Sequence, residues 1–73
     1  MRITDAQSKK LLEYSGTVQL KQLAMSFALT RFKNKYKANP SPEVIASCTN
    51  DLNLLFSKYE SIMRDDFAWI TSL

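Results

Sequence analysis

The sequence predicts an all-α protein, built as an antiparallel helical hairpin with a shorter N-terminal helix. Between Ile45 and Ile62, apolar residues recur at alternating steps of three and four, which is the spacing of one face of a helix. Pro40 and Pro42 separate this segment from a second apolar segment, and a capping box at Thr4 marks a helix start near the N-terminus. We therefore expect one helical domain over residues 1–73, with helices at approximately residues 5–15, 17–37 and 42–72.

The first helix, residues 5–15, is predicted from its capping signals. The Thr4 hydroxyl can accept from the backbone of Gln7, whose side-chain amide can reach back to Thr4. Gly16, the only glycine in the chain, suits the left-handed conformation that ends many helices. The apolar residues available to pack this helix are few: Ile3, Leu11, Leu12 and Tyr14. We expect a helix that is mobile or that orders only on binding.

The second helix, residues 17–37, follows an expected N-cap at Thr17. Placed at steps of about 100°, its apolar residues fall into two nearly opposite sectors. The first sector contains Val18, Met25, Ala28, Leu29, Phe32 and Tyr36, and the second contains Leu20, Leu23, Ala24 and Phe27. A helix that is apolar on two sides needs two neighbours.

The break between the second and third helices is predicted at residues 38–43. Pro40 disfavours a helical conformation at Asn39, Ser41 is a good N-cap, and Pro42 falls at the first helical position, where its missing N–H costs nothing. Glu43 then complements the helix dipole. Because the turn is short, we expect the flanking helices to pack antiparallel.

The third helix, residues 42–72, is predicted to be longer than the second and to extend past it. Its apolar seam comprises Ile45, Cys48, Leu52, Leu55, Tyr59 and Ile62. The extension carries Met63, Phe67, Trp69, Ile70 and Leu73, which should be covered either by the first helix or by another protein. For the hairpin core we expect Leu29, Phe32, Leu52, Leu55 and Phe56.

The composition argues against an enzyme. The chain contains no histidine and one cysteine, Cys48, which lies on the apolar seam and is expected to be a buried structural thiol. Asp65 and Asp66 are adjacent, but neighbouring helical residues point about 100° apart, so a solvated or interfacial role is expected rather than a catalytic pair. We predict no catalytic residues, no metal site and no cofactor.

The hydropathy pattern argues against membrane insertion. Hydrophobic residues make up 45% and charged residues 23% of the chain, and no apolar run reaches the roughly 18 residues that a spanning helix needs. The first ten residues also lack the apolar core of a signal peptide. We expect a cytoplasmic location.

A basic run in the second helix offers an alternative function. Four of its residues are cationic: Arg31, Lys33, Lys35 and Lys37. With a net charge of +3 and Tyr36 nearby, the run could contact a nucleic-acid backbone and stack on a base. However, these cations project from different sides of the helix, and a solvated helix end that complements the dipole explains them better. Nucleic-acid binding is therefore the less favoured interpretation.

Two family resemblances can be stated from these segments. Residues 22–33, the turn 39–43 and the later Leu52, Leu55 and Ile62 resemble the small YscE-type co-chaperones of type III secretion needle subunits. That resemblance implies a helical hairpin that joins a second, tetratricopeptide-like chaperone to keep the needle subunit soluble. Residues 42–45, residues 49–55 and Tyr59 are also similar to the helical hairpin of Spo0E-like aspartyl-phosphate phosphatases. Thr49 and Asn53 stand where that family has serine and aspartate, so this alternative is a Spo0E-like hairpin that lacks the acidic catalytic residue.

Taken together, the patterns favour a non-enzymatic protein-binding module, and the co-chaperone resemblance implies a cytoplasmic chaperone subunit. Both a hetero-complex and a homodimer remain open, and a small helical regulator is a further alternative. The second apolar side of the second helix and the extension of the third helix are the expected partner surface. The residues expected on that surface are Leu20, Leu23, Phe27, Phe67, Trp69 and Ile70. For Phe67 and Trp69, packing against the hairpin core is the alternative.

Overall fold

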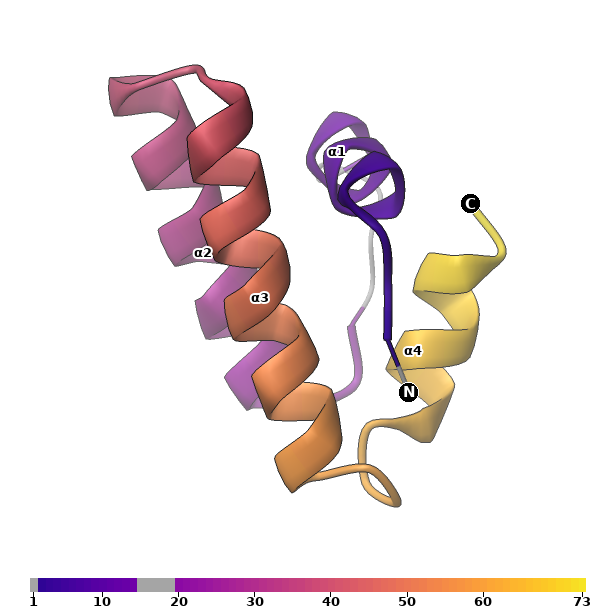
Figure 1. Cartoon of the computed structure of the whole chain (residues 1–73). Helices are drawn as coiled ribbons and strands as arrows, with labels where there is room; N and C mark the ends of the chain where they lie inside the picture. Colours follow the sequence, from indigo (N-terminus) through magenta and orange to yellow (C-terminus); the bar gives the residue numbers. More distant parts are fainter. Residues whose placement is uncertain (1, 15–19) are drawn as a thin grey trace.

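A computed structural model describes residues 2–14 and 20–73 of the chain (Figure 1). Within those ranges the protein is all-α, as predicted, with four helices and no strands. The helices are α1 (Asp5–Glu13), α2 (Leu23–Ala38), α3 (Pro42–Lys58) and α4 (Arg64–Thr71).

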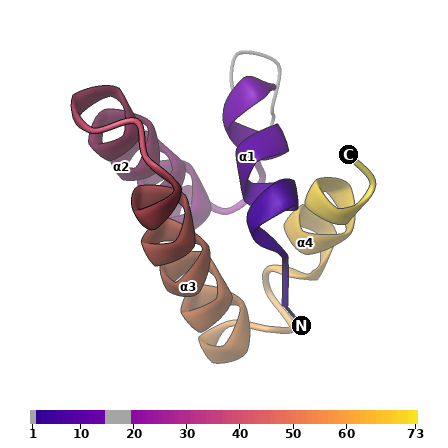
Figure 2. The same ribbon diagram turned by 45° about the horizontal axis from the view of Figure 1, so that its top comes forward.

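The helices are arranged around α1. Figures 1 and 2 show α2 and α3 side by side, with α1 next to them and α4 on the far side of α1. The short N-terminal helix is therefore central, because α1 contacts α2, α3 and α4. Leu11 and Ser8 of α1 are fully buried. The few apolar residues of the first helix lie in the middle of the molecule, where the helix contacts three others. Its mobility, or its ordering on binding, stays a prediction.

Two helix starts follow their local sequence signals. At α1, the Thr4 side chain accepts from the Gln7 N–H and the Gln7 side chain accepts from the Thr4 N–H, which confirms the capping box. At α3, the Ser41 hydroxyl accepts from the Val44 N–H and Pro42 occupies the first turn, as predicted. Helix α1 ends at Glu13 with Tyr14 as its C-cap, while the predicted caps Gly16 and Thr17 lie outside the described residues.

The second helix begins later than its apolar pattern predicts. Residues 20–22 are not helical, and α2 starts at Leu23 rather than near residue 17. The backbone N–H groups of Lys21 and Gln22 instead donate to the Asp66 side chain, at 2.8 and 3.0 Å. A contact from a distant part of the chain therefore sets the start of α2.

The predicted third helix, residues 42–72, is in fact two helices, α3 and α4, separated by residues 59–63. No proline or glycine causes this break. A continuous helix would leave the apolar residues after Ile62 in water, whereas the return of α4 buries Met63 and Ile70. Burial of these side chains outweighs the local preference for an uninterrupted helix. The extension folds back as α4 and packs against α1, so the first helix covers it, which was one of the two alternatives predicted.

The core draws residues from all four helices and the segments beside them. Its buried apolar members are Ile3, Leu11, Met25, Ala28, Leu29, Phe32, Ile45, Cys48, Leu52, Phe56, Met63 and Ile70. Four of the five residues predicted for the hairpin core, Leu29, Phe32, Leu52 and Phe56, are buried in it. The fifth, Leu55, is only partly buried against its edge. Cys48 is a buried free thiol, as expected.

Candidate functional site

The most exposed large apolar side chain of the described residues is Leu23, at 69%, and Phe27 one turn later is 58% exposed. Residues four apart on a helix are neighbours on its surface, so Leu23 and Phe27 form one apolar patch. The next two positions at the same spacing are Arg31 and Lys35, which are also exposed. These four residues are called the α2 ridge below. It is apolar at its N-terminal end and cationic at its C-terminal end.

The opposite side of α2 explains why the ridge stays exposed. Met25, Leu29 and Phe32 are buried against the other helices. Because a helix cannot turn both faces to one core, burying this set forces the ridge outward. The two apolar sectors predicted for the second helix therefore differ in burial. One sector packs in the core, and the other has no neighbouring helix over most of its length.

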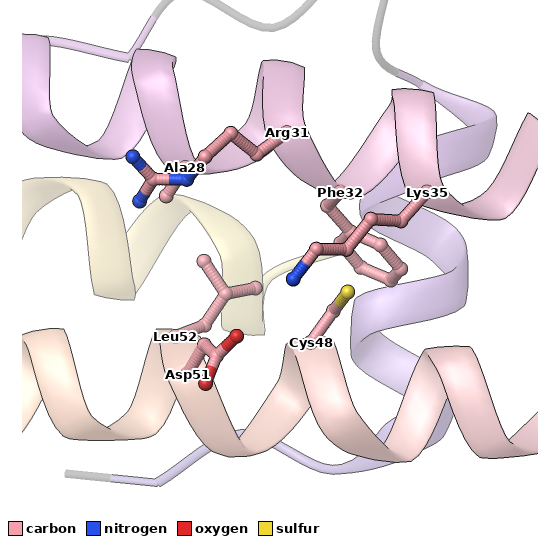
Figure 3. A pocket seen from close by; sticks show the side chains of 7 residues that line it. All are labelled: Ala28, Arg31, Phe32, Lys35, Cys48, Asp51 and Leu52. Atoms are coloured by element: carbon pink, nitrogen blue, oxygen red, sulfur yellow. The ribbon is translucent and has the colours of Figure 1, made fainter.

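The cationic end of the ridge borders a small hollow between α2 and α3 (Figure 3). Its cavity volume is about 20 Å³, which is room for about one water molecule. The lining residues are Ala28, Arg31, Phe32, Lys35, Cys48, Asp51 and Leu52. Figure 3 shows the Lys35 amine and the Asp51 carboxylate pointing into this hollow from opposite helices. The space is too small for a substrate or cofactor.

The Cys48 thiol at this hollow is expected to be unreactive. Its side chain is buried, and burial, followed by the charge of Asp51, raises its pKa, while the nearby charge of Lys35 acts in the opposite direction. Because the thiolate is the reactive form, both low exposure and a raised pKa slow its reaction.

We therefore expect an aromatic disulfide reagent to label Cys48 slowly at neutral pH in the folded protein and rapidly in denaturant. Absorbance of the released thiol checks this expectation. Labelling of the folded protein as fast as a cysteine in a short unstructured peptide would contradict it.

The residues predicted for the partner surface do not form one surface. Leu23 and Phe27 are exposed as expected, and Trp69 is 37% exposed on α4. Ile70 is wrong as a surface residue, because it is fully buried. Leu20 and Phe67 are half-buried and pack against the core. The rings of Phe67 and Phe56 lie edge to face with centroids 5.1 Å apart, so the alternative of core packing is the correct one for Phe67.

The two adjacent carboxylates of α4 have different surroundings. Asp66 is only 3% exposed, and it accepts hydrogen bonds from the Lys21 and Gln22 N–H groups. Asp65 is exposed and pairs with the Lys21 ammonium at 2.9 Å. The first turn of α2 contains no acidic residue, and Gln22 offers no side-chain cap. Asp66 therefore supplies, from α4, the acceptor that the start of α2 lacks. The expected solvated role holds for Asp65, whereas Asp66 is buried at this internal contact.

The exposed pair makes stability weakly dependent on pH. The hydrogen bond from Lys21 and its charge lower the pKa of Asp65, and the same contact raises the pKa of Lys21. The stability from Asp65 is present above its unfolded pKa and is lost as pH falls through its lower folded pKa. The stability from Lys21 is present below its unfolded pKa and is lost as pH rises through its higher folded pKa.

An Asp65→Asn variant should therefore melt slightly below the parent protein at neutral pH, and the difference should disappear in strong acid. Both side chains are exposed and screened, so the effect is small. Thermal melts across the acid range check this expectation. A difference that grows as pH falls would contradict it.

The positions that resemble a phosphatase motif hold the N-terminal segment in place. The Asn53 side chain accepts from the Ile3 N–H at 2.7 Å and donates to the Ile3 carbonyl at 3.0 Å. The Thr49 hydroxyl donates to the Ile45 carbonyl at 2.7 Å and lies 2.6 Å from the Ser8 hydroxyl. Thr49, Asn53 and Ser8 are all buried. These hydrogen bonds give both motif positions a structural role.

Replacing Asn53 should release the N-terminal segment. Asn53→Ala leaves the buried Ile3 N–H and carbonyl without partners, which costs about 1–3 kcal/mol of unfolding free energy. Amide hydrogen exchange at Ile3 should accelerate, and denaturant unfolding should give the free energy. Asn50→Ala on the exposed side of α3 is the matched control and should change neither quantity. Unchanged protection of Ile3 in Asn53→Ala would contradict this role.

The four cations of α2 do not form one basic surface. Arg31 and Lys35 lie on the ridge, Lys33 is half-buried, and Lys37 is exposed about 200° around the helix from Lys35. Sequence reasoning identified the exposed apolar pair and the basic run separately, without joining them. The signal that joins them is the constant spacing of four residues from Leu23 to Lys35.

The described part of the chain also contains no group of three or more His, Cys, Asp or Glu side chains that could hold a metal ion. Across residues 2–14 and 20–73, none of the helices has both the length and the apolar content that membrane crossing requires. Comparison with known proteins gives no match to a protein-family model, to a curated protein or to a solved structure.

Proposed function

We propose that the protein is a non-enzymatic protein-binding module and that the α2 ridge is its docking surface. The observation that carries this proposal is the exposure of Leu23 and Phe27 as an adjacent pair. The fold buries its core without them, and Leu23 is the most exposed large apolar side chain of the described residues. Large apolar side chains next to cations are typical of the anchors of protein interfaces.

The scaffold in this proposal is a hairpin of α2 and α3, with α1 packed against both helices and α4 packed against α1. Such a scaffold presents the ridge on a helix that is held by its neighbours, which lowers the entropy lost on binding. A partner that covers the ridge with about 800 Å² on each side would form an interface of standard size.

The narrower form of the proposal is a cytoplasmic co-chaperone that helps a second chaperone keep a secretion-apparatus subunit soluble. The segment that resembles the co-chaperone family, residues 22–33, includes Leu23, Phe27 and Arg31 of the ridge. An exposed apolar helix face is what a chaperone subunit uses to join its partner. A homodimer through the same ridge is the competing form.

Site-specific cross-linking tests the proposal. A photo-reactive phenylalanine analogue in place of Phe27 should cross-link to a defined protein in cells, whereas the same analogue in place of the exposed Ala46 on α3 should not. Mass spectrometry of the product distinguishes a second copy of this chain from a different protein. Adding Leu23→Ala should remove the cross-link. Equal products from positions 27 and 46 would contradict a docking role for the ridge.

A further inference from the structure

We propose that the occupant of the α2 ridge is an amphipathic helix of a partner protein whose first turns are acidic and whose following turns are apolar. This inference rests on the proposed function and specifies the partner chemistry of the same site. The partner helix runs opposite to α2, with its acidic turns over Arg31 and Lys35 and its apolar turns over Phe27 and Leu23.

The row of residues is suited to contact with a helix. Positions four apart form a ridge that packs into the groove of a neighbouring helix. On α2 this ridge extends from Leu23 to Lys35, which covers most of the 16 residues of the helix. All four of its side chains are exposed. Leu23 and Phe27 supply the apolar area that a partner would bury. Because they lie at one end of the ridge, the two ends differ, and a partner helix can bind in a preferred orientation.

The cationic end of the ridge lacks an ion-pair partner within the described residues. Lys21 pairs with Asp65 there, whereas neither Arg31 nor Lys35 forms an ion pair. Asp51 faces the same hollow without forming an ion pair with either cation. Two cations beside one carboxylate leave the hollow electropositive, and an acidic side chain from a partner would complete the charge balance.

The helix dipole determines the orientation of the partner. Acidic side chains stabilise the first turn of a helix, and cations stabilise the last turn. Lys35 lies in the last turn of α2. A partner helix whose acidic first turn lies over Lys35 has acidic residues at its own N-terminus and faces a cation at the C-terminus of α2, as the two dipoles favour. The two helix dipoles are then antiparallel. A partner with its acidic residues at the C-terminal end would meet the same charges but would oppose its own dipole.

A nucleic acid fits the ridge less well. A phosphate backbone is bound by many cations along one face, but only Arg31 and Lys35 share the ridge, because Lys37 projects from another side of α2. The exposed Leu23 would gain nothing from a phosphate. The experiment below therefore includes a DNA duplex as a competitor.

Two stapled helical peptides of identical composition provide the probe. Each has about the length of α2 and contains two turns rich in glutamate and two turns rich in leucine and phenylalanine, in opposite orders; blocked ends and staples equalise their helicity. The peptide with the acidic turns first should bind the folded protein about fivefold more tightly, by fluorescence anisotropy. A nitroxide on its N-terminus should broaden amide signals near Lys35 rather than near Leu23. Equal affinity of the two peptides, or broadening near Leu23, would overturn the inference.

Charge reversal tests the cationic end. Arg31→Glu with Lys35→Glu should weaken binding of the acidic-first peptide about tenfold and reverse its dependence on salt, because salt then screens a repulsion. Lys9→Glu with Lys37→Glu makes the same change in net charge on exposed positions away from the ridge, and it should change the affinity less than about twofold. Equal losses in the two double variants would overturn the inference. A DNA duplex that displaces the peptide and binds more tightly than it would also overturn it, in favour of a nucleic-acid partner.

The outcomes separate this inference from the proposed function. If the cross-linker at position 27 captures one protein but Arg31→Glu with Lys35→Glu leaves that product unchanged, the docking function stands and the acidic partner helix is wrong. If position 27 gives no product that the Ala46 control lacks, the docking function itself is wrong.

Discussion

Replacement of Phe56 by alanine is expected to bring the isolated protein close to unfolding. Phe56 is fully buried, and its ring packs edge to face on Phe67, with centroids 5.1 Å apart. Truncating a buried phenylalanine costs about 3–5 kcal/mol, through lost burial and the cavity that remains. A domain of this size has a total stability of only about 4–11 kcal/mol. The substitution should therefore remove a large part of the free energy of unfolding. It also removes the edge-to-face ring contact between α3 and α4.

Urea unfolding followed by circular dichroism gives the free energy, and Phe27→Ala is the matched control. The same atoms are removed, but from a side chain that is 58% exposed, so the change in unfolding free energy should stay within about 0.5 kcal/mol. In a binding measurement, Phe27→Ala should lose the partner although it remains folded. Comparable destabilisation by both substitutions would mean that the core and the ridge are not separate surfaces.

The sequence patterns predicted those parts of the fold that local chemistry determines. The capping box at Thr4 and the Ser41–Pro42 start of α3 depend on residues a few positions apart, and both are present. Most of the hairpin core was also predictable, because helical periodicity identifies which side of a segment is apolar. These features need no knowledge of the rest of the chain.

The features that the patterns missed depend on contacts between distant residues. Residues 59–63 contain no helix breaker, so nothing local indicates that α4 turns back. Asn53 meets Ile3 across 50 positions, and Asp66 meets Lys21 across 45. A polar residue at such a site looks like any solvated helix residue until its partner is known.

The candidate surface was predictable to the same extent. An exposed apolar pair on the second helix follows from its two apolar sectors, and Leu23 and Phe27 confirm it. Phe67 and Ile70 were assigned to the same surface because the third helix was expected to continue into solvent. Once α4 folds back, Ile70 joins the core and Phe67 packs against it. The exposed predicted residues are then Leu23 and Phe27 on α2 and the partly exposed Trp69 on α4. Part of the predicted site was therefore wrong because the change of direction at residues 59–63 was not predicted.

Replacement of Asp66 by alanine is expected to loosen the junction between α4 and the start of α2. The change leaves two backbone N–H groups, those of Lys21 and Gln22, without their acceptor. Each lost buried acceptor costs about 1–3 kcal/mol, and partial access of water to this junction reduces the sum, so we expect a loss of about 2–3 kcal/mol. Hydrogen exchange at Lys21 and Gln22 should accelerate more than exchange in the middle of α3.

Two further variants identify the cause of that loss. Asp66→Asn keeps one carbonyl acceptor and should recover part of the stability, because one of the two N–H groups stays paired. Asp65→Ala makes the same change in net charge as Asp66→Ala but removes only an exposed ion pair, so its melting temperature should barely change. If Asp65→Ala were as damaging as Asp66→Ala, the general charge of α4 would matter rather than the cap that Asp66 provides. If Asp66 alone matters, α2 begins where it does because α4 has folded back to meet it.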